Sequence, residues 1–210
     1  MTDDDFYQFL CRFYTASFEH IKAGASFYIW HADNESLVFR KALEDSGITR
    51  RQTLVWVKNS FTLGRQDYQW RHEPCLYGWK DGAAHYFTNS RSETTVIDDT
   101  PDFDKMKKDE AIRLLKDIYG REASTIIYED KPRTSPLHPT MKPLPLIGYL
   151  IQNSSKPKQS VLDPFGGSGT TLMASEQLNR ICYTMELDPQ YADVIVDRWE
   201  KFTGQEALKL

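Results

Sequence analysis

The stretch VLDPFGGSGTT, residues 161–171, decides the fold of this chain. The apolar residues before Asp163 predict a short buried parallel strand, and three glycines follow within four positions. A helix-compatible run then spans residues 170–179. This order of strand, glycine turn and helix is typical of a nucleotide-type cofactor site, because glycines let backbone N–H groups approach a ligand that the helix N-terminus faces.

A second acid follows at the spacing that such a site requires. An apolar strand expected at residues 181–185 ends in Glu186, and the separation from Asp163 is 186 − 163 = 23 residues. This is close to the roughly 20 residues expected for an acid that binds a ribose hydroxyl. No lysine follows the glycines as in a P-loop, and the spacing is not that of a dinucleotide fingerprint. The pattern predicts a nucleoside cofactor without a pyrophosphate, for which S-adenosylmethionine is the obvious candidate. The alternative is an ordinary strand-to-helix turn in which glycine supplies positive φ.

The composition indicates one globular domain with room for an insertion. A chain of 210 residues with 40% hydrophobic and 13% aromatic residues can bury a substantial core. Because the net charge is −4, contact with nucleic acid needs a local basic face. The three cysteines show neither a metal-binding spacing nor a disulfide framework, which indicates a reducing cytoplasm. The acidic N-terminus does not resemble a signal peptide, and no apolar run reaches the length of a membrane span.

The first third of the chain is expected to alternate helices with strands. The predicted elements are a helix over residues 3–22, a strand over 26–30, a helix over 35–45 and a strand over 51–57. His31 and Asp33 come at the carboxyl end of the first strand, the edge that lines the ligand crevice in doubly wound folds. We interpret Asp33 as a cap of the next helix, whereas His31 suits capping and a ligand contact equally.

Residues 58–74, KNSFTLGRQDYQWRHEP, are expected to form a long loop that ends in an apolar strand at 75–79. A loop of this length without its own periodicity is usually functional or disordered. Basic and aromatic side chains interleaved in one loop suit phosphate contact and base stacking. The candidate nucleic-acid contacts are Lys58, Arg65, Tyr68, Trp70 and Arg71. The alternative is a hairpin with a solvated tip.

Residues 81–135 are the least regular part and are interpreted as a subdomain inserted on the main sheet. The elements expected there are a strand at 85–87, a linker at 98–104, an amphipathic helix at 105–119 and a strand at 124–128. A proline-rich segment at 131–145 then leads to a helix that starts near residue 144. Asp188 and Pro189 open the last helix, as N-cap and first helical residue.

Together these segments resemble the amino-methyltransferases of DNA, the adenine-N6 and cytosine-N4 enzymes of bacteria and phages, in the permuted group whose cofactor motif comes late. The resemblance covers nearly the whole chain. DPFGGSGTT at 163–171 is similar to the family's cofactor loop, HPTMKP at 138–143 to the segment that covers the methionine part of the cofactor, and MELDPQY at 185–191 to the ribose-binding acid and its helix. Further matches are SFYIWHAD at 26–33, QTLVWVKNSF at 52–61 and HEPCLYGWK at 72–80.

The resemblance implies an α/β fold of the S-adenosylmethionine-dependent methyltransferase (Rossmann-like) type with a mixed sheet. It divides the chain into an N-terminal half of the sheet at 1–80, an inserted target-recognition segment at 81–135 and a cofactor-binding half at 136–210. It also implies double-stranded DNA as the partner, a role in restriction and modification, no metal and a cytoplasmic location. The residues that it assigns to the cofactor are His138, Pro139, Lys142, Asp163, Pro164, Phe165, Gly166, Gly167, Gly169, Thr170, Glu186 and Leu187.

One element of the family's pattern is absent from this sequence. The catalytic tetrapeptide of the family is an Asp, Asn or Ser followed by two prolines and an aromatic residue, and no such tetrapeptide occurs here. DPQY at 188–191 follows the ribose acid and is explained by helix capping. The catalytic residues are therefore unknown, and we expect the sheet to be incomplete where the strand that carries them would lie.

The missing tetrapeptide bears directly on the chemistry. An exocyclic amine is a poor nucleophile because its lone pair is conjugated with the ring, so the family's tetrapeptide accepts its hydrogens and stacks on the flipped base. We therefore interpret the chain as a fragment or split half of a site-specific DNA methyltransferase, with adenine-N6 favoured over cytosine-N4. A complementing N-terminal segment or a homodimer would supply the rest. The alternatives are a non-catalytic cofactor- or DNA-binding module and a small-molecule or RNA methyltransferase on the same fold.

Overall fold

The computed structural model describes residues 2–62, 65, 67–88, 95–97 and 142–209 of the chain. The described elements, in chain order, are α1 (Asp3–Glu19), β1 (Ser26–Trp30), the 3₁₀ turn η1 (Asp33–Glu35), α2 (Ser36–Asp45), β2 (Arg50–Thr62), β3 (Trp70–Trp79), β4 (Val96–Ile97), α4 (Leu144–Ser154), β5 (Ser160–Asp163), α5 (Thr170–Gln177), β6 (Ile181–Thr184) and α6 (Pro189–Thr203). None of these helices is long and apolar enough to cross a membrane.

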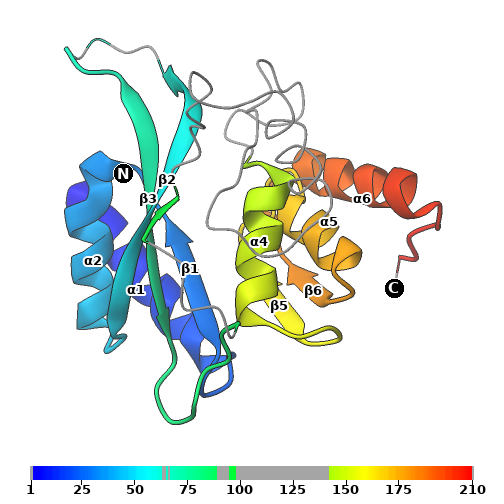
Figure 1. Cartoon of the computed structure of the whole chain (residues 1–210), viewed down its shortest axis with the longest axis horizontal. Coiled ribbons are helices and arrows are strands. Elements are labelled where there is room, and N and C mark those ends of the chain that lie inside the picture. Colours follow the sequence, from blue (N-terminus) through cyan, green and yellow to red (C-terminus); the bar gives the residue numbers. More distant parts are fainter. Residues whose placement is uncertain (1, 63–64, 66, 89–94, 98–141, 210) are drawn as a thin grey trace, which may run out of the picture.

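The strands form two sheets. The first has the order β1-β3-β2-β4, with β3 antiparallel to β1 and β2, and β4 parallel to β2. The second consists of β5 and β6, which are parallel and pair Asp163 with Thr184 at their carboxyl ends. Within the described ranges, β1 and β5 are thus edge strands of different sheets. Figure 1 shows α4 lying between the two sheets in that view.

Helix α1 begins at a capping box, as its acidic start predicts. The Thr2 hydroxyl accepts a hydrogen bond from the backbone N–H of Asp5 at 3.2 Å, and the Asp5 carboxylate accepts from the backbone N–H of Thr2 at 3.1 Å. These two bonds satisfy N–H groups that have no partner inside the helix. Leu10 and Tyr14, one turn apart, are the buried residues of α1 and face the first sheet.

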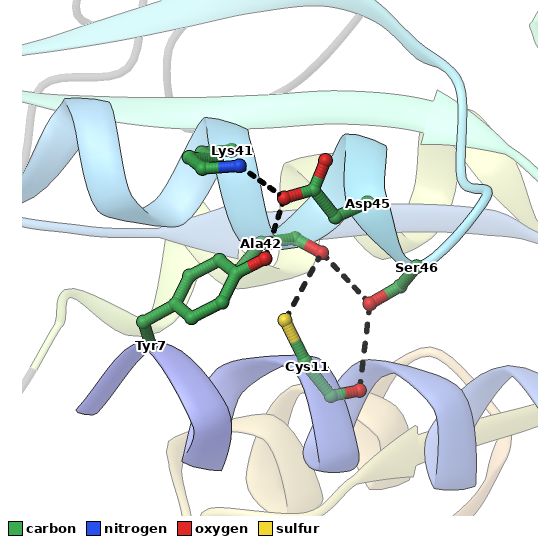
Figure 2. Close-up of polar contacts among 6 residues, drawn as sticks. All are labelled: Tyr7, Cys11, Lys41, Ala42, Asp45 and Ser46. Carbon is green, nitrogen blue, oxygen red and sulfur yellow. Dashed lines mark hydrogen bonds and ion pairs between the residues drawn. The ribbon is translucent and has the colours of Figure 1, made fainter. Parts of the chain in front are cut away.

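The main core lies between α1, α2 and one face of the first sheet. Its buried members are Leu10, Tyr14, Phe27, Ala42, Leu43, Ile48 and Leu76. A polar seam joins the two helices at the edge of this core, where the Tyr7 hydroxyl and the Lys41 ammonium both donate to the Asp45 carboxylate (Figure 2). Beside them, the Ser46 hydroxyl donates to the carbonyl of Ala42 at 2.7 Å.

The opposite face of the first sheet is covered by α4. Leu146 of α4 is fully buried against Trp56 of β2 and Trp30 of β1. The hydroxyl groups of Tyr28 in β1 and Ser154 in α4 lie 2.6 Å apart and share a hydrogen bond. Because α4 also packs on α5, this helix is the element that connects the two sheets.

The helices and strands predicted next to the glycine stretch are confirmed within two residues, whereas helix α1 ends three residues before its predicted end and the long loop is not formed. Strand β2 extends to Thr62, and strand β3 begins at Trp70. Most of residues 58–74 therefore continue the antiparallel ladder. Hydrogen bonds to a neighbouring strand hold this polar segment in a strand despite its lack of an apolar pattern. Pairing is irregular between Val57 and Thr62, which indicates a bulge.

Two further expectations about the inserted region differ from the structure. Residues 85–87 form no strand. The His85 ring instead stacks on the Trp79 ring with centroids 3.7 Å apart, and the backbone N–H of Thr88 donates to the carbonyl of Asn153. A short strand, β4, occurs where none was predicted. The linker, helix and strand expected at 98–104, 105–119 and 124–128 lie outside the described residues.

Candidate cofactor site

The glycine turn joins β5 to α5 in a left-handed conformation. Gly167 and Gly169 have φ of 54° and 80°, values that favour glycine, and Gly169 is the N-cap of α5. The backbone N–H of Gly166 donates to the carbonyl of Met185 at 2.8 Å, and that of Gly169 donates to the carbonyl of Gly166 at 2.8 Å. The turn is thus fixed to the end of β6 by backbone bonds.

The turn also lies too close to its neighbours to accept side chains. A Cβ added to Gly166 would lie 2.6 Å from Oγ1 of Thr184 and 2.8 Å from Cδ1 of Ile195. A Cβ on Gly169 would lie 3.2 Å from Ile195. The Arg198 guanidinium of α6 donates to the carbonyl of Ser168 in the same turn. Helix α6 therefore packs against the turn through Ile195 and Arg198.

Glu186 lies directly against the turn, as the spacing of 23 residues predicts. One carboxylate oxygen accepts from the backbone N–H of Gly167 at 2.7 Å, and the other accepts from that of Asp188 at 3.0 Å. Asp188 caps α6 by accepting from the backbone N–H of Gln190 at 2.9 Å. The Glu186 carboxylate thus joins the glycine turn to the start of α6.

Asp163 ends β5 beneath the turn. Its carboxylate accepts from the backbone N–H of Phe165 at 3.1 Å. Burial raises the pKa of Asp163, and the charge of Glu186 adds to the increase, while hydrogen bonds from Thr171 and Phe165 and the charge of Lys142 act against it. Two carboxyl groups therefore meet at the carboxyl ends of β5 and β6, where a ligand with several hydrogen-bond donors fits.

Exposed apolar side chains neighbour these acids in the chain. Leu187, next to Glu186, is 98% exposed, and Phe165 and Met185 are also exposed. The Phe165 ring packs on Phe13 of α1 with centroids 4.8 Å apart. Pro164 is half-buried, whereas Thr170 is buried with its hydroxyl 3.4 Å from that of Ser168. Polar groups that orient a ligand among exposed apolar side chains are typical of a small-molecule site.

Lys142, just before α4, belongs to a charged cluster on the first sheet. The Glu73 carboxylate lies 2.7 Å from the Lys58 ammonium and 3.5 Å from the Lys142 ammonium. Burial acts to raise the pKa of Glu73, but the two lysines outweigh it and hold that pKa below its usual value. His138 and Pro139, assigned to the cofactor with Lys142, lie outside the described residues.

Comparison with known proteins agrees with this geometry. The sequence profile of a family described as DNA methylase, with N6 and N4 specificity, matches residues 2–197. The chain belongs to this family. The resemblance found in the sequence is therefore confirmed.

Three curated relatives of the chain are type II methyltransferases. M.BglII of Bacillus subtilis is 26% identical over 160 residues, which cover 74% of this chain and 44% of the relative. M2.MboI of Moraxella bovis is 33% identical over 101 residues, which cover 48% of this chain and 36% of the relative. M.HindIII of Haemophilus influenzae is 44% identical over 61 residues, which cover 29% of this chain and 20% of the relative. The chain thus spans less than half the length of these curated relatives.

Solved structures share the fold. A complex of M1.HpyAVI with SAM aligns with a TM-score of 0.69 at 22% identity, covering 95% of this chain and 85% of that one. A DNA modification methylase of Thermus thermophilus aligns with a TM-score of 0.66 at 23% identity, and the alignment covers 98% of this chain and 84% of that one. The cytosine-N4-specific PvuII DNA methyltransferase aligns with a TM-score of 0.65 at 16% identity, and the alignment covers 96% of this chain and 76% of that one. The predicted methyltransferase-type α/β fold is confirmed.

The five residues predicted to contact nucleic acid do not share one environment in the structure. Arg65 and Tyr68 are exposed at the end of the β2–β3 hairpin, with Tyr68 91% exposed. Trp70 packs edge-on against His72, and the Arg71 guanidinium donates to the carbonyl of Lys58 at 3.0 Å. The Lys58 ammonium points inward, since the residue is buried and paired with Glu73. The structure thus groups Lys58 with Lys142 rather than with the hairpin tip.

His31 and Asp33 take structural places. His31 is buried, its Nε2 lies 3.0 Å from the Ser36 hydroxyl at the start of α2, and its ring stacks on Phe39. Burial lowers the pKa of His31, which favours the neutral ring. The interpretation of Asp33 as a helix cap is wrong: Asp33 lies inside the 3₁₀ turn, and neither that turn nor α2 has a side-chain cap.

Sequence reasoning did not single out three residues of the site. Glu73 joins two lysines, Arg198 holds the turn, and Ile195 packs against Gly166 and Gly169. Glu73 follows Arg71 and His72 in a polar run just before the apolar segment 75–79, and a carboxylate next to such a segment requires a partner once it is buried. Neither Arg198 nor Ile195 carries a comparable signal, since both fit an ordinary amphipathic helix.

Proposed function

We propose that this chain forms the cofactor half of a DNA methyltransferase that moves the methyl group of S-adenosylmethionine to an exocyclic amine of a flipped base. Adenine-N6 is favoured over cytosine-N4. The observation that carries the proposal is the bond between Glu186 and the Gly167 N–H, which brings the acid proposed to bind the ribose onto a turn that has no room for a side chain at Gly166 or Gly169. Membership of the DNA methylase family supports it.

The residues present fit S-adenosylmethionine. Glu186 would accept hydrogen bonds from the ribose hydroxyls, and exposed Leu187 and Phe165 would contact the flat adenine ring. Lys142, with His138 and Pro139, would hold the methionine part. The bound cofactor would supply a methyl group on a sulfonium centre, and the chain's task is to orient it and exclude water from its apolar surroundings.

The second half of the active site would come from a complementing segment or a second copy. Acceptors for the two hydrogens of the target amine are required, and this sequence lacks the family's tetrapeptide. The face of the second sheet formed by Leu162, Ile181 and Tyr183 is exposed. Parallel strands are normally covered on both faces, so this face suits a further segment of a complete enzyme.

DNA contact is assigned to the hairpin and the inserted segment. Arg65 and Tyr68 offer an exposed cation and an exposed ring for phosphate contact and stacking, with Trp70 and Arg71 behind them. Residues 81–135 would recognise the target sequence. With DNA as the substrate, we also expect a cytoplasmic location and a role in restriction and modification.

Calorimetry with S-adenosylmethionine and transfer of a tritiated methyl group to unmethylated DNA test these assignments. Glu186→Ala and Asp163→Ala should each weaken cofactor binding at least ten-fold, as expected when a buried hydrogen-bond partner is lost. Unchanged dissociation constants in both variants would refute the cofactor site. Methyl transfer should require the complementing N-terminal segment of a related enzyme added in trans.

The same assay separates the second candidate function, a non-catalytic binding module, which the missing tetrapeptide favours. Cofactor binding without methyl transfer, even with the added segment, would establish that alternative. For the hairpin, Tyr68→Ala should weaken DNA binding by about 1–3 kcal/mol, the range for loss of one stacking ring, and leave cofactor affinity unchanged. Equal loss of both affinities would indicate misfolding instead.

A further inference from the structure

Two lysines and one glutamate share a small region between the first sheet and the start of α4. Lys58 of β2 is buried, with its ammonium 2.7 Å from Glu73 of β3. Lys142 reaches the other oxygen of the same carboxylate at 3.5 Å. One carboxylate therefore holds two ammonium groups, and the cluster keeps a net charge of +1.

The strand register explains how these side chains meet. Trp56 pairs with Glu73 across β2 and β3, and Trp30 pairs with Cys75 across β1 and β3, so all four side chains are on one face of the sheet. Lys58, two residues after Trp56, lies on that face as well. It is the face that α4 covers with Leu146.

The two tryptophans complete the cage. The Lys58 ammonium lies 5.6 Å from the Trp56 ring centroid, and the Lys142 ammonium lies 5.5 Å from that of Trp30. The two rings meet edge-to-face with centroids 6.2 Å apart. Each cation therefore has an aromatic ring and a carboxylate as partners, which restricts its rotamers far more than a solvated ion pair would.

Lys142 also acts on the cofactor half. Its charge favours the ionised form of Asp163, which lies at the end of β5 beside the glycine turn. Lys142 comes two residues before α4, the helix that packs on α5. The position of this ammonium is therefore set by Glu73 on the first sheet, while its field reaches a carboxyl group of the second.

We propose that Glu73 and Lys58 are positioning residues of the cofactor site: they hold Lys142 in place and so set cofactor affinity without touching the cofactor. This inference rests on the proposed function. Lys58 binds one oxygen of the Glu73 carboxylate and so fixes the orientation in which the other oxygen faces Lys142. Its buried place in this cluster replaces the contact with DNA that the sequence suggests.

Calorimetry of S-adenosylmethionine binding tests the inference with a double-mutant cycle. Glu73→Gln should weaken binding about ten-fold, in the range of couplings between sites that do not share a ligand contact. Lys58→Met, which keeps the volume of the side chain, should weaken it by a smaller factor in the same direction. Once Lys142→Met has removed the residue through which Glu73 acts, adding Glu73→Gln should change the dissociation constant less than two-fold.

The matched control breaks another ion pair of the same sheet. Arg51 and Asp81 lie 2.5 Å apart at the surface, so Asp81→Asn should leave cofactor affinity unchanged. Thermal unfolding of every variant checks that binding is measured on folded protein.

Three outcomes would overturn the inference. In the first, Glu73→Gln binds as tightly as the wild type. In the second, Glu73→Gln weakens cofactor binding by the same factor whether Lys142 is present or replaced by Met, so that the two effects add. In the third, the loss follows the fraction of unfolded protein, which would make the role structural. Each of these leaves the proposed function intact if the wild type binds the cofactor, whereas a wild type that fails to bind would overturn both.

Discussion

The two sheets of the protein are stabilised in different ways. At the first sheet, Leu43 of α2 and Leu76 of β3 are fully buried in the core between the two helices and the strands. In the second sheet, Ile181 and Tyr183 are 50% and 60% exposed on one face. The glycine turn of the second sheet is nevertheless tightly bonded to β6 and α6. The first sheet thus supplies stability through its core, and the second carries the candidate cofactor turn, which is held mostly by backbone hydrogen bonds.

The largest effect should come from the core of the first sheet. Leu43→Ala removes a side chain with no exposed surface and should lower the free energy of unfolding by about 3 kcal/mol, through lost burial and the cavity left behind. Urea unfolding measures it. Leu208→Ala, at a position that is 83% exposed, is the control and should change stability by less than about 0.5 kcal/mol. A loss at Leu43 no larger than this would show that the core does not stabilise the protein.

The glycine turn should respond in both stability and binding. Gly166→Ala places a Cβ 2.6 Å from Thr184 and should cost about 1–3 kcal/mol through overpacking, with cofactor affinity at least ten-fold weaker. The matched change is Gly148→Ala inside α4, where the nearest atom would be 3.8 Å away. That variant should gain about 0.5–1 kcal/mol from helix propensity and bind normally. Similar behaviour of the two variants would refute the close packing of the turn.

Asp163 should show opposite effects on stability and binding. Because its pKa is raised in the folded state, the ionised carboxylate destabilises the fold, and this cost grows as the pH rises through the ordinary value of 3.8 towards the folded value. Asp163→Asn keeps an oxygen for the Phe165 N–H and removes the charge. Above that pH range, the variant should melt at a higher temperature than the wild type while it binds the cofactor less tightly. A variant that melts lower at pH 7 would contradict the burial argument.

The smallest effect is expected on the exposed face of the second sheet. Ile181→Thr should change the free energy of unfolding by at most about 0.5 kcal/mol, because half of the side chain is already in water. The same change at Ile48, which is 8% exposed, should cost about 2 kcal/mol because it buries a hydroxyl in the core. Equal costs at the two positions would remove the difference between the sheets.

Local patterns were sufficient for much of the fold and for the position of the glycine turn. An apolar run predicts the strand at 26–30. An apolar run followed by glycines predicts the strand, turn and helix after residue 160, because these signals act within a few residues. The acid Glu186 was found by spacing alone, because a parallel crossover returns the chain to the same sheet edge. The bond to Gly167 then confirms that it lies on the turn.

Features that depend on distant partners could not be predicted. The strand character of residues 58–62 and 70–74 comes from hydrogen bonds between strands, which leave no apolar pattern in the segment itself. Lys58 looked like a surface cation because nothing in its neighbourhood reveals that Glu73, fifteen residues later, lies 2.7 Å from its ammonium. Burial of a lysine is a property of the tertiary structure, not of the sequence around it.

The bond between Glu186 and the Gly167 N–H has a consequence for the thermodynamics of ligand binding. The turn is held by this bond and by the carbonyl of Met185 before any ligand arrives, so its backbone entropy has already been lost on folding. A ligand that enters such a preorganised turn does not have to order it, and more of the contact energy appears as affinity. We therefore expect fast association with little change in the amide exchange of residues 163–170, in contrast to a loop that folds around its ligand.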